Sequence, residues 1–435
     1  MSAAPHFTFA ARLQAMLDVE AALAEAEAAL DIIPRSAAPA IRDACRADLY
    51  DGAALQADAR RDGNLAIPLV RQLTRHVATA DAAAAHYVHW GATSQDVIDT
   101  GLVLQLRNSV PGIVDDLGRA AAAAARHARH HANTPMAGRT WLQQATPITF
   151  GLKAAGWVDA LDRVRCGVAN ALDGALVLQF GGASGTLAAL GDRGIPVAVN
   201  IAATLRLQVP SVPWHGHRDR LAALCCALGV AAGALGKIAR DITLLAQTEV
   251  GEAREGQSGG SSTMPQKQNP VNAAIALASA VRAPGLVATV LAAMPQEHER
   301  GLGGWQAEWD TIPELVGVTA DAAEAIAESV GNLVVEPARM RANLDSSGGL
   351  VLAEAVAMRL APRLGKEQAH VLVENAARRV VRNGRRFAEV LAEDPQIASV
   401  LDRAAIDEAL SPEKYLGSAS AFIAAVLARH AKGSG

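Results

Sequence analysis

The chain has 435 residues, more than one hydrophobic core usually supports, so it is too large for a small binding module. We expect two or three subdomains, or one very elongated one. Its formal net charge of -4 excludes a general basic field that would attract nucleic acid or an anionic membrane. An anionic substrate must therefore meet a local cluster of cations.

Two features bear on the location of the protein. The N-terminal sequence MSAAPHFTFA lacks a basic region followed by an apolar stretch and a cleavage site, so we expect no secretory signal. The cysteines lack metal-site spacing, which predicts reduced thiols in a cytoplasmic protein; they are Cys45, Cys166, Cys225 and Cys226. We expect neither a nucleic acid nor a membrane as a partner, and neither a metal nor an organic cofactor.

Long helices are the main predicted elements, because only 3% of the residues are aromatic and Ala and Leu dominate long stretches without proline. Strand signals are almost missing. The predicted helices run from Gly112 to about Ala132, from Arg218 to Val250, from Val271 to about Ala293 with a break near Pro284, and from Trp305 to about Leu333 with an interruption at Pro313.

These elements predict an all-α protein with an elongated three-domain subunit. An N-terminal helical domain would cover residues 1–108, a central bundle of long helices residues 109–340, and a C-terminal helical domain residues 341–435.

The stretch from Arg218 to Val250 has a heptad-type seam of large apolar residues, namely Leu221, Leu224, Leu228, Leu235, Ile238, Ile242 and Leu245. No charged residue lies between Arg220 and Lys237, so this helix needs cover on nearly every side. The uncharged 16 residues from Leu221 to Gly236 are expected to be too short and too weakly apolar to span a bilayer. A helical core shared by several subunits is the predicted cover.

The segment HYVHWGATSQDVIDT, residues 86–100, has the features of a helix start. Thr93 or Ser94 can cap the helix, and Thr93 with Asp96 has the spacing of a capping box. Capping hydroxyls and free backbone N–H groups also suit a bound carboxylate, and His89 adds a titratable donor nearby. A capped helix and a carboxylate site are both consistent with these residues.

The segment AGRTWLQQATPITFG, residues 137–151, contains polar residues shortly before a proline. Arg139, Thr140 and Gln143 could end one helix and begin another, or they could contact a substrate.

The segment GQSGGSSTMPQKQNP, residues 256–270, begins with glycines and serines that predict a mobile loop. Asn269 and Pro270 predict an N-cap and a first-turn proline for the next helix. Lys267 and the positive end of that helix would then lie beside a pair of serines, which suits a lid that closes on an anion. An ordinary surface loop is the alternative for the glycines and serines alone.

These segments together resemble the fumarase/aspartase superfamily. GSSTMPQKQNP matches each fixed position of its GSSxMPxKxNP motif, and the first two segments resemble its HxGxTSxD and second conserved regions. The resemblance implies that Ser261 exchanges a proton with carbon, that Lys267 and Asn269 bind a substrate carboxylate, and that Ser262 and Met264 line the site. It implies the same for His89, Thr93, Ser94, Arg139, Thr140, Trp141 and Gln143.

Trp141 separates this chain from the adenylosuccinate lyases of the superfamily, which carry His after the Arg-Thr pair. A missing acid is tolerated if the leaving group is a carboxylate, whose conjugate acid has a pKa of about 4. The resemblance therefore implies a cycloisomerase acting on a small tricarboxylate. An adenylosuccinate lyase or an inactive structural homologue are the alternatives.

The resemblance also implies a homotetramer in which each active site is shared between subunits. Arg218 and Arg300 are candidate cations for a substrate with three carboxylates, and surface ion pairs are the alternative for both.

Overall fold

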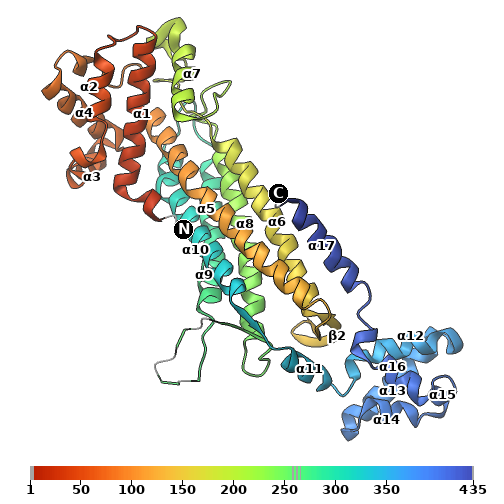
Figure 1. Cartoon of the computed structure of the whole chain (residues 1–435). Helices are drawn as coiled ribbons and strands as arrows, with labels where there is room; N and C mark the ends of the chain where they lie inside the picture. The colour runs from red at the N-terminus through yellow and green to blue at the C-terminus, as the bar shows by residue number, and fades with distance from the viewer. Residues whose placement is uncertain (1–3, 257–258, 261–262, 265, 434–435) are drawn as a thin grey trace. The chain divides into compact units, whose positions relative to one another are not determined.

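We describe the protein from a computed structural model, shown in Figure 1. The described residues are 4–256, 259–260, 263–264 and 266–433, so Ser261 and Ser262 lie outside them. Helices dominate the described chain, and the few strands are short. The expected all-α class is therefore confirmed.

The chain divides into two compact units, each made of three segments. Unit 1 comprises residues 1–116, 164–233 and 278–324, and unit 2 comprises residues 117–163, 234–277 and 325–435. The boundaries fall inside long helices rather than in linkers. The division into domains at residues 108 and 340 stays a prediction.

Unit 1 begins with helices that pack around α1 (Phe9–Ala29), which contacts α2 (Ala37–Ala44) and α7 (Gly194–Leu205), as Figure 1 shows. The other elements that lie wholly in this unit are η1 (Ala4–Phe7), η2 (Ala47–Leu49), α3 (Gly52–Asp62), α4 (Ala66–Ala80), η3 (Ala84–Tyr87) and η4 (Ala188–Arg193).

Five helices contribute residues to both units: α5 (Ser94–His130), α6 (Phe150–Ala175), α8 (Asp219–Leu245), α9 (Val271–Ala293) and α10 (Gly304–Gly331).

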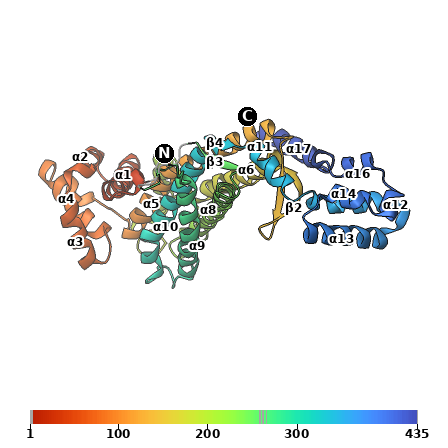
Figure 2. The same ribbon diagram turned by 90° about the horizontal axis from the view of Figure 1, so that it is seen from below.

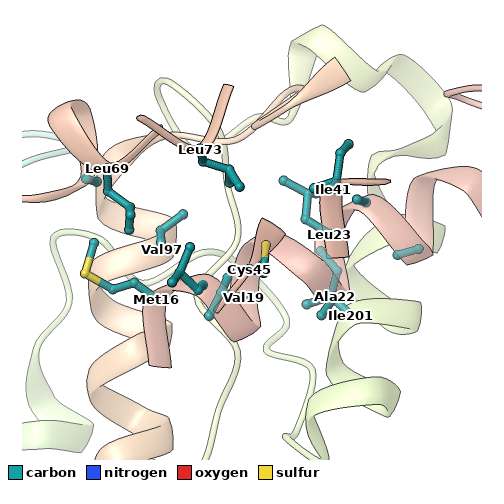
Figure 3. Close-up of a cluster of buried hydrophobic side chains, with 14 of the residues drawn as sticks. Met16, Val19, Ala22, Leu23, Ile41, Cys45, Leu69, Leu73, Val97 and Ile201 are labelled. Atoms are coloured by element: carbon teal, nitrogen blue, oxygen red, sulfur yellow. The ribbon is translucent and has the colours of Figure 1, made fainter. Parts of the chain in front are cut away.

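The core of unit 1 lies around α1, whose N-cap Thr8 accepts a hydrogen bond from the Ala11 backbone N–H. Small alanines alternate with Leu and Met along this helix, so neighbouring helices approach it closely. The residues labelled in Figure 3 come from several helices and meet in one apolar cluster: Met16, Val19, Ala22, Leu23, Ile41, Cys45, Leu69, Leu73, Val97 and Ile201. This core supports the buried carboxylates of α1.

Glu27 of α1 is one of these carboxylates, and neither of its oxygens has a hydrogen-bond partner among the described residues. Burial, together with the charge of Glu20, raises the pKa of Glu27 from 4.5 to about 9. The folded state therefore holds this proton more tightly than the unfolded chain does. The resulting stability is fully present below about pH 4.5 and is lost as the pH rises toward 9.

We expect Glu27→Gln, which is isosteric and cannot ionise, to raise Tm by roughly 5 °C at about pH 8 and by much less at about pH 5. Thermal unfolding of both proteins at the two pH values measures this difference. An equal change at both values would show that the effect is one of packing and not of proton binding.

Unit 2 contains two small antiparallel sheets and a C-terminal group of helices. Strands β1 (Pro135–Thr140) and β2 (Gln143–Thr149) pair in one sheet, and β3 (Ala253–Glu255) and β4 (Leu333–Val335) pair in the other. The remaining elements are α11 (Pro337–Asp345), η5 (Leu350–Leu352), α12 (Ala353–Leu364), α13 (Lys366–Asn383), α14 (Phe387–Ala392), α15 (Pro395–Ala398), α16 (Arg403–Ala409), η6 (Pro412–Lys414) and α17 (Ala419–Gly433).

The C-terminal helices have a second apolar core. α12 packs against α13, and α13 packs against α14, as Figure 2 shows from below. The buried residues include Val356, Leu360, Val373, Phe387 and Ile406. Gly384, with φ of 65°, ends α13 in the left-handed conformation that favours glycine.

The segment at residues 137–151 is a β-hairpin and not the junction of two helices. Thr140 pairs with Gln143, so Trp141 and Leu142 form a two-residue turn in which both have positive φ, 51° and 64°. Such turns normally contain Asn or Gly. Because Trp and Leu disfavour this backbone, the sequence carried no turn signal, and the hairpin was not predicted.

Two predicted helix interruptions are also wrong. α9 continues through Pro284 and α10 continues through Pro313. α5 begins at Ser94 rather than Gly112 and includes Pro111. An internal proline costs about 3 kcal/mol by removing one backbone hydrogen bond, a cost that long packed helices tolerate.

The heptad seam predicted for residues 218–250 is confirmed. Each seam residue from Leu221 to Leu245 is at most 4% exposed in α8. The prediction that this region is too short for a membrane span is not supported, because α8 has 27 residues and an 18-residue window of mean hydropathy 1.9. α9 is also long and apolar enough to cross a membrane, by length and composition only, with a mean hydropathy of 1.7. A core helix of a soluble protein passes the same test, and 56% of the α8 window is buried within the chain.

Candidate active site

The start of α5 is organised by Asp96, a buried carboxylate that accepts four hydrogen bonds. Its Oδ2 accepts from the backbone N–H groups of Thr93 at 3.0 Å and Gly182 at 2.9 Å. Its Oδ1 accepts from the Gly181 N–H at 2.9 Å and from His215 Nε2 at 2.7 Å. The bond from Thr93 N–H is the carboxylate half of the expected capping box.

Through its bonds to Gly181 and Gly182, Asp96 also holds the glycine turn in residues 180–185, which read FGGASG. Gly182 has φ of 68°, and a Cβ there would lie 3.0 Å from the Gly91 carbonyl oxygen. Glycine is thus required where this turn passes close to the loop before α5.

Arg300 and Thr93 come together in unit 1, although 207 residues separate them in the sequence. The Arg300 guanidinium donates to Thr93 Oγ1 and to the Ala183 carbonyl, both at 3.1 Å. Its Nε is buried without a hydrogen-bond partner among the described residues. The guanidinium also forms no ion pair with a carboxylate among those residues. Arg300 therefore keeps an unneutralised positive charge beside the start of α5, which is what an anionic ligand needs.

His89 lies in the loop before α5 with its Nδ1 2.6 Å from Glu20 Oε1 of α1. Burial disfavours the charged ring, but attraction to Glu20, the hydrogen bond to it and the charge of Asp96 outweigh burial and raise the pKa of His89. His89 thus lies in the same loop as Thr93, and a shared site for the two residues stays a prediction. Ser94 is the first residue of α5 and is partly exposed.

Arg218 corrects an expectation, because it is neither a free cation nor part of a surface ion pair. Its side chain is 0% exposed and makes paired hydrogen bonds to Asp99, at 2.7 and 3.1 Å, and to Glu308, at 2.5 to 3.1 Å. Trp305 Nε1 also donates to Asp99 Oδ1. With two buried carboxylates around it, Arg218 is a neutralised cation in the core of unit 1.

Arg139, on β1 in unit 2, also has a carboxylate partner. Its two terminal nitrogens donate to the Oε atoms of Glu252 at 2.6 and 2.8 Å, and Glu252 is fully buried. Asn343 Nδ2 donates to the same carboxylate at 2.8 Å. Arg139 therefore anchors the hairpin to the chain next to β3.

The tip of the hairpin is open to solvent in the single chain. Trp141 is 97% exposed, and Thr140 and Gln143 beside it are exposed as well. An exposed Trp on a backbone that disfavours it indicates a residue kept for contact with something beyond this chain.

Met264 and residues 266–270 line one side of a cavity of 640 Å³ in unit 2. Two backbone hydrogen bonds join Gly259 and Asn269, at 2.9 and 3.0 Å, and close the base of the segment. Lys267 is exposed and forms no ion pair among the described residues. The cavity is lined by Thr243, Gln247, Arg254, Met264, Lys267 and Asn269 among others. Three of the residues expected to bind substrate therefore share one cavity.

The positive end of α9 is not free, contrary to expectation. Glu255 accepts from the backbone N–H groups of Asn272 at 3.2 Å and Ala273 at 2.9 Å, and from Ser329 Oγ at 2.7 Å. A buried carboxylate thus caps the helix, and Asn269 instead donates from its side chain to the Gly260 carbonyl. The local positive charge comes from Lys267 without help from this helix end.

Glu20, His215, Glu252 and Glu255 were missed as parts of these arrangements. For Glu20 a signal existed, because Leu13, Met16, Glu20, Leu23 and Glu27 follow a heptad spacing that places two acids in an apolar seam. The other three have no local signal, since their partners are far apart in the sequence. No cluster of three or more metal-ligating side chains occurs within residues 4–256, 259–260, 263–264 and 266–433.

Comparison with known families agrees with these motifs. Residues 4–285 match the lyase family, and residues 349–426 match the family described as the adenylosuccinate lyase C-terminus. The chain belongs to the lyase family of the fumarase/aspartase superfamily.

Individual relatives are similar over almost their whole length. The 3-carboxy-cis,cis-muconate cycloisomerase of Pseudomonas aeruginosa is 52% identical over 98% of this chain and 93% of its own. That of Bradyrhizobium diazoefficiens is 52% identical over 94% of this chain and 92% of its own. The crystal structure of the 3-carboxy-cis,cis-muconate lactonizing enzyme from Pseudomonas putida superposes with a TM-score of 0.95 at 48% identity, covering 100% of this chain and 97% of that one.

Proposed function

We propose that this protein is a cycloisomerase that converts 3-carboxy-cis,cis-muconate to 4-carboxymuconolactone, in the protocatechuate branch of the β-ketoadipate pathway. The observation that carries the proposal is the 52% identity over 98% of the chain to a relative of that name. Trp141, at the position where adenylosuccinate lyases carry His, agrees with it.

The reaction needs three events and no external acid for a leaving group. A substrate carboxylate oxygen forms a C–O bond to an alkene carbon, and the alkene electron pair moves onto the neighbouring carbon and its carboxylate. The resulting aci-carboxylate is dianionic at that group, and protonation of its carbon gives the lactone. The net change is the uptake of one proton, because one carboxylate becomes an ester. In the reverse direction the leaving group is a carboxylate, which departs without a proton.

The candidate site residues have different roles in this reaction. Ser261 delivers the proton to carbon, and Lys267 with nearby N–H donors stabilises the dianionic intermediate. Asn269, Met264 and Ser262 complete that side of the site.

His89, Thr93, Ser94 and Arg300 bind a carboxylate, and the unneutralised charge of Arg300 beside Thr93 supports this assignment. Trp141, Thr140 and Gln143 contact the substrate from the hairpin tip, and Arg139 holds that hairpin through Glu252.

The active enzyme is a homotetramer in which each site draws on several subunits. Only 22% of the apolar α9 window is buried in the single chain, and Val281, at 79% exposure, and Val230 of α8, at 63%, lie open. Apolar helices left open need a partner, and bundling the central helices of four chains would cover them. The exposed Trp141 likewise suits a site completed by another chain.

The enzyme works in the cytoplasm on a free small tricarboxylate, without nucleic acid or membrane as a partner. The net charge of -4 and the four free cysteines support this location.

One pair of assays tests the function. Purified protein is mixed with 3-carboxy-cis,cis-muconate, and the loss of the conjugated-diene absorbance is followed together with proton uptake. Adenylosuccinate cleavage is measured in parallel. Diene loss without adenylosuccinate cleavage supports the proposal. Cleavage without diene loss would assign the chain to the adenylosuccinate lyases, and neither activity would indicate an inactive homologue.

We expect Trp141→His not to accelerate lactonisation, because the reaction has no leaving group that needs a proton in either direction. Steady-state kcat for the variant and the wild type on the same substrate measures this, and adenylosuccinate cleavage is expected to stay absent. A higher kcat in the variant would mean that an acid at the hairpin tip is useful after all.

A further inference from the structure

Glu20 is a buried carboxylate that depends on one partner. Its side chain is 0% exposed and lies in the apolar core around α1, among residues such as Met16, Leu17 and Leu23. Oε1 lies 2.6 Å from His89 Nδ1, whereas Oε2 has no hydrogen-bond partner among the described residues. A buried carboxylate is costly unless a cation or a donor meets it, so Glu20 favours a proton on His89 Nδ1.

The backbone of His89 is strained in a way that maintains this contact. His89 has φ of 59°, in the left-handed region that costs a residue with a Cβ of the order of 1 kcal/mol. Gly91, two residues on, has φ of 71°, and a Cβ there would lie 2.8 Å from Leu190. The loop therefore has an unusual backbone conformation. It places the imidazole in hydrogen-bond contact with Glu20 of α1, which is 69 residues away in the sequence.

The second ring nitrogen of His89 is left for a ligand. The structure gives Nε2 no hydrogen-bond partner among the described residues, and the side chain keeps 17% of its surface exposed. Thr93 and Arg300, from the proposed carboxylate site, belong to the same unit. With Nδ1 occupied by Glu20, only Nε2 can donate to a substrate.

The charges around the ring favour the imidazolium. α1 contributes Glu20, and α5 contributes Asp96; both raise the pKa of His89. Glu27, also on α1, is kept neutral by its pKa of about 9. Cys45 and Tyr50, which also interact with Glu20, are neutral because burial raises the pKa of both. Arg300 is the nearby cation that bonds to Thr93.

We propose that Glu20 is a positioning residue that holds His89 as a cationic Nε2–H donor to a substrate carboxylate, rather than as a proton-abstracting base. The inference rests on the proposed function for its substrate. Its consequence is a charge on His89 that persists above the pH at which an ordinary histidine, with a pKa of about 6.5, is neutral.

The test compares Glu20→Gln with a matched control, Glu27→Gln, which changes the same buried residue type two turns along the same helix. For Glu20→Gln we expect KM for 3-carboxy-cis,cis-muconate to rise by about tenfold or more near pH 8, with a smaller rise of KM near pH 6 and a smaller change in kcat. Glu27→Gln should follow the wild-type profile at both pH values. Glu20→Asp keeps the charge and should show an intermediate profile, which preserves the test if Glu20→Gln folds poorly.

A second readout does not depend on turnover. NMR titration of the ring signal that disappears in His89→Asn should show an upward-shifted pKa in wild type and Glu27→Gln, and a lower one in Glu20→Gln. The inference is overturned if the pKa of His89 is the same in wild type and Glu20→Gln, if Glu20→Gln lowers kcat with KM unchanged, or if Glu27→Gln has the same effect. A wild-type protein that shows the ring titration but no diene loss would reject the proposed function and leave the role of Glu20 in holding the proton intact.

Discussion

Replacing Ser261 with alanine is expected to lower kcat by about 100- to 10,000-fold, while the dissociation constant of the substrate changes little. The hydroxyl is the proposed source of the proton added to carbon, and removing a general acid or base typically has an effect of this size. Binding should persist because the carboxylate contacts come from other residues, among them Lys267, Asn269 and Arg300. Stopped-flow loss of diene absorbance gives kcat, and calorimetry with the inert tricarboxylate tricarballylate reports binding.

Ser262→Ala is the matched control, since it removes the same group from the neighbouring position. A much smaller loss of kcat is expected for it. Near-normal turnover of Ser261→Ala would move proton transfer to another group, with Ser262 and His89 as the next candidates. A large loss of tricarballylate binding by Ser261→Ala would instead make the hydroxyl a binding group.

The second large effect concerns assembly. Ser261→Ala and a Thr93→Ala/Ser94→Ala variant should each be inactive alone, and a mixture that is unfolded and refolded together should recover about a quarter of the wild-type activity. If the serine segment and the start of α5 in one site come from different chains, random mixing in equal amounts gives each site both intact segments with a probability of about one quarter. Activity per tetramer, with assembly checked by light scattering, measures this.

Each variant refolded alone is the control for incomplete unfolding, and refolded wild type sets the full scale. Mixtures that form tetramers but stay as inactive as their parents would show that each chain builds its own site. Recovery near one half would mean that only one of the two substitutions is fully inactivating.

The helices were predictable from the sequence because their signal is local. The seam from Leu221 to Leu245 follows from spacing alone, and α8 buries it as expected. Local signals gave wrong predictions where tertiary packing overrides residue propensity. Pro284 and Pro313 lie inside continuous helices. The turn at Trp141 and Leu142 forms without a residue that favours turns. Packing over a long helix or hairpin outweighs the few kcal/mol that one unfavourable residue costs.

The sequence by itself determined which family motifs and which polar residues the site contains, since each motif is a short run whose residues are neighbours in the chain. Only the tertiary structure decided which charges are free to act. Arg218 meets Asp99 and Glu308, about 120 and 90 residues away, and Arg139 meets Glu252, 113 residues away, whereas Arg300 finds a hydroxyl and no carboxylate. In the same way Glu20 of α1 is the partner of His89 in the loop before α5. An ionisable side chain is defined by its neighbours in space, and folding brings those neighbours from segments that no local pattern connects.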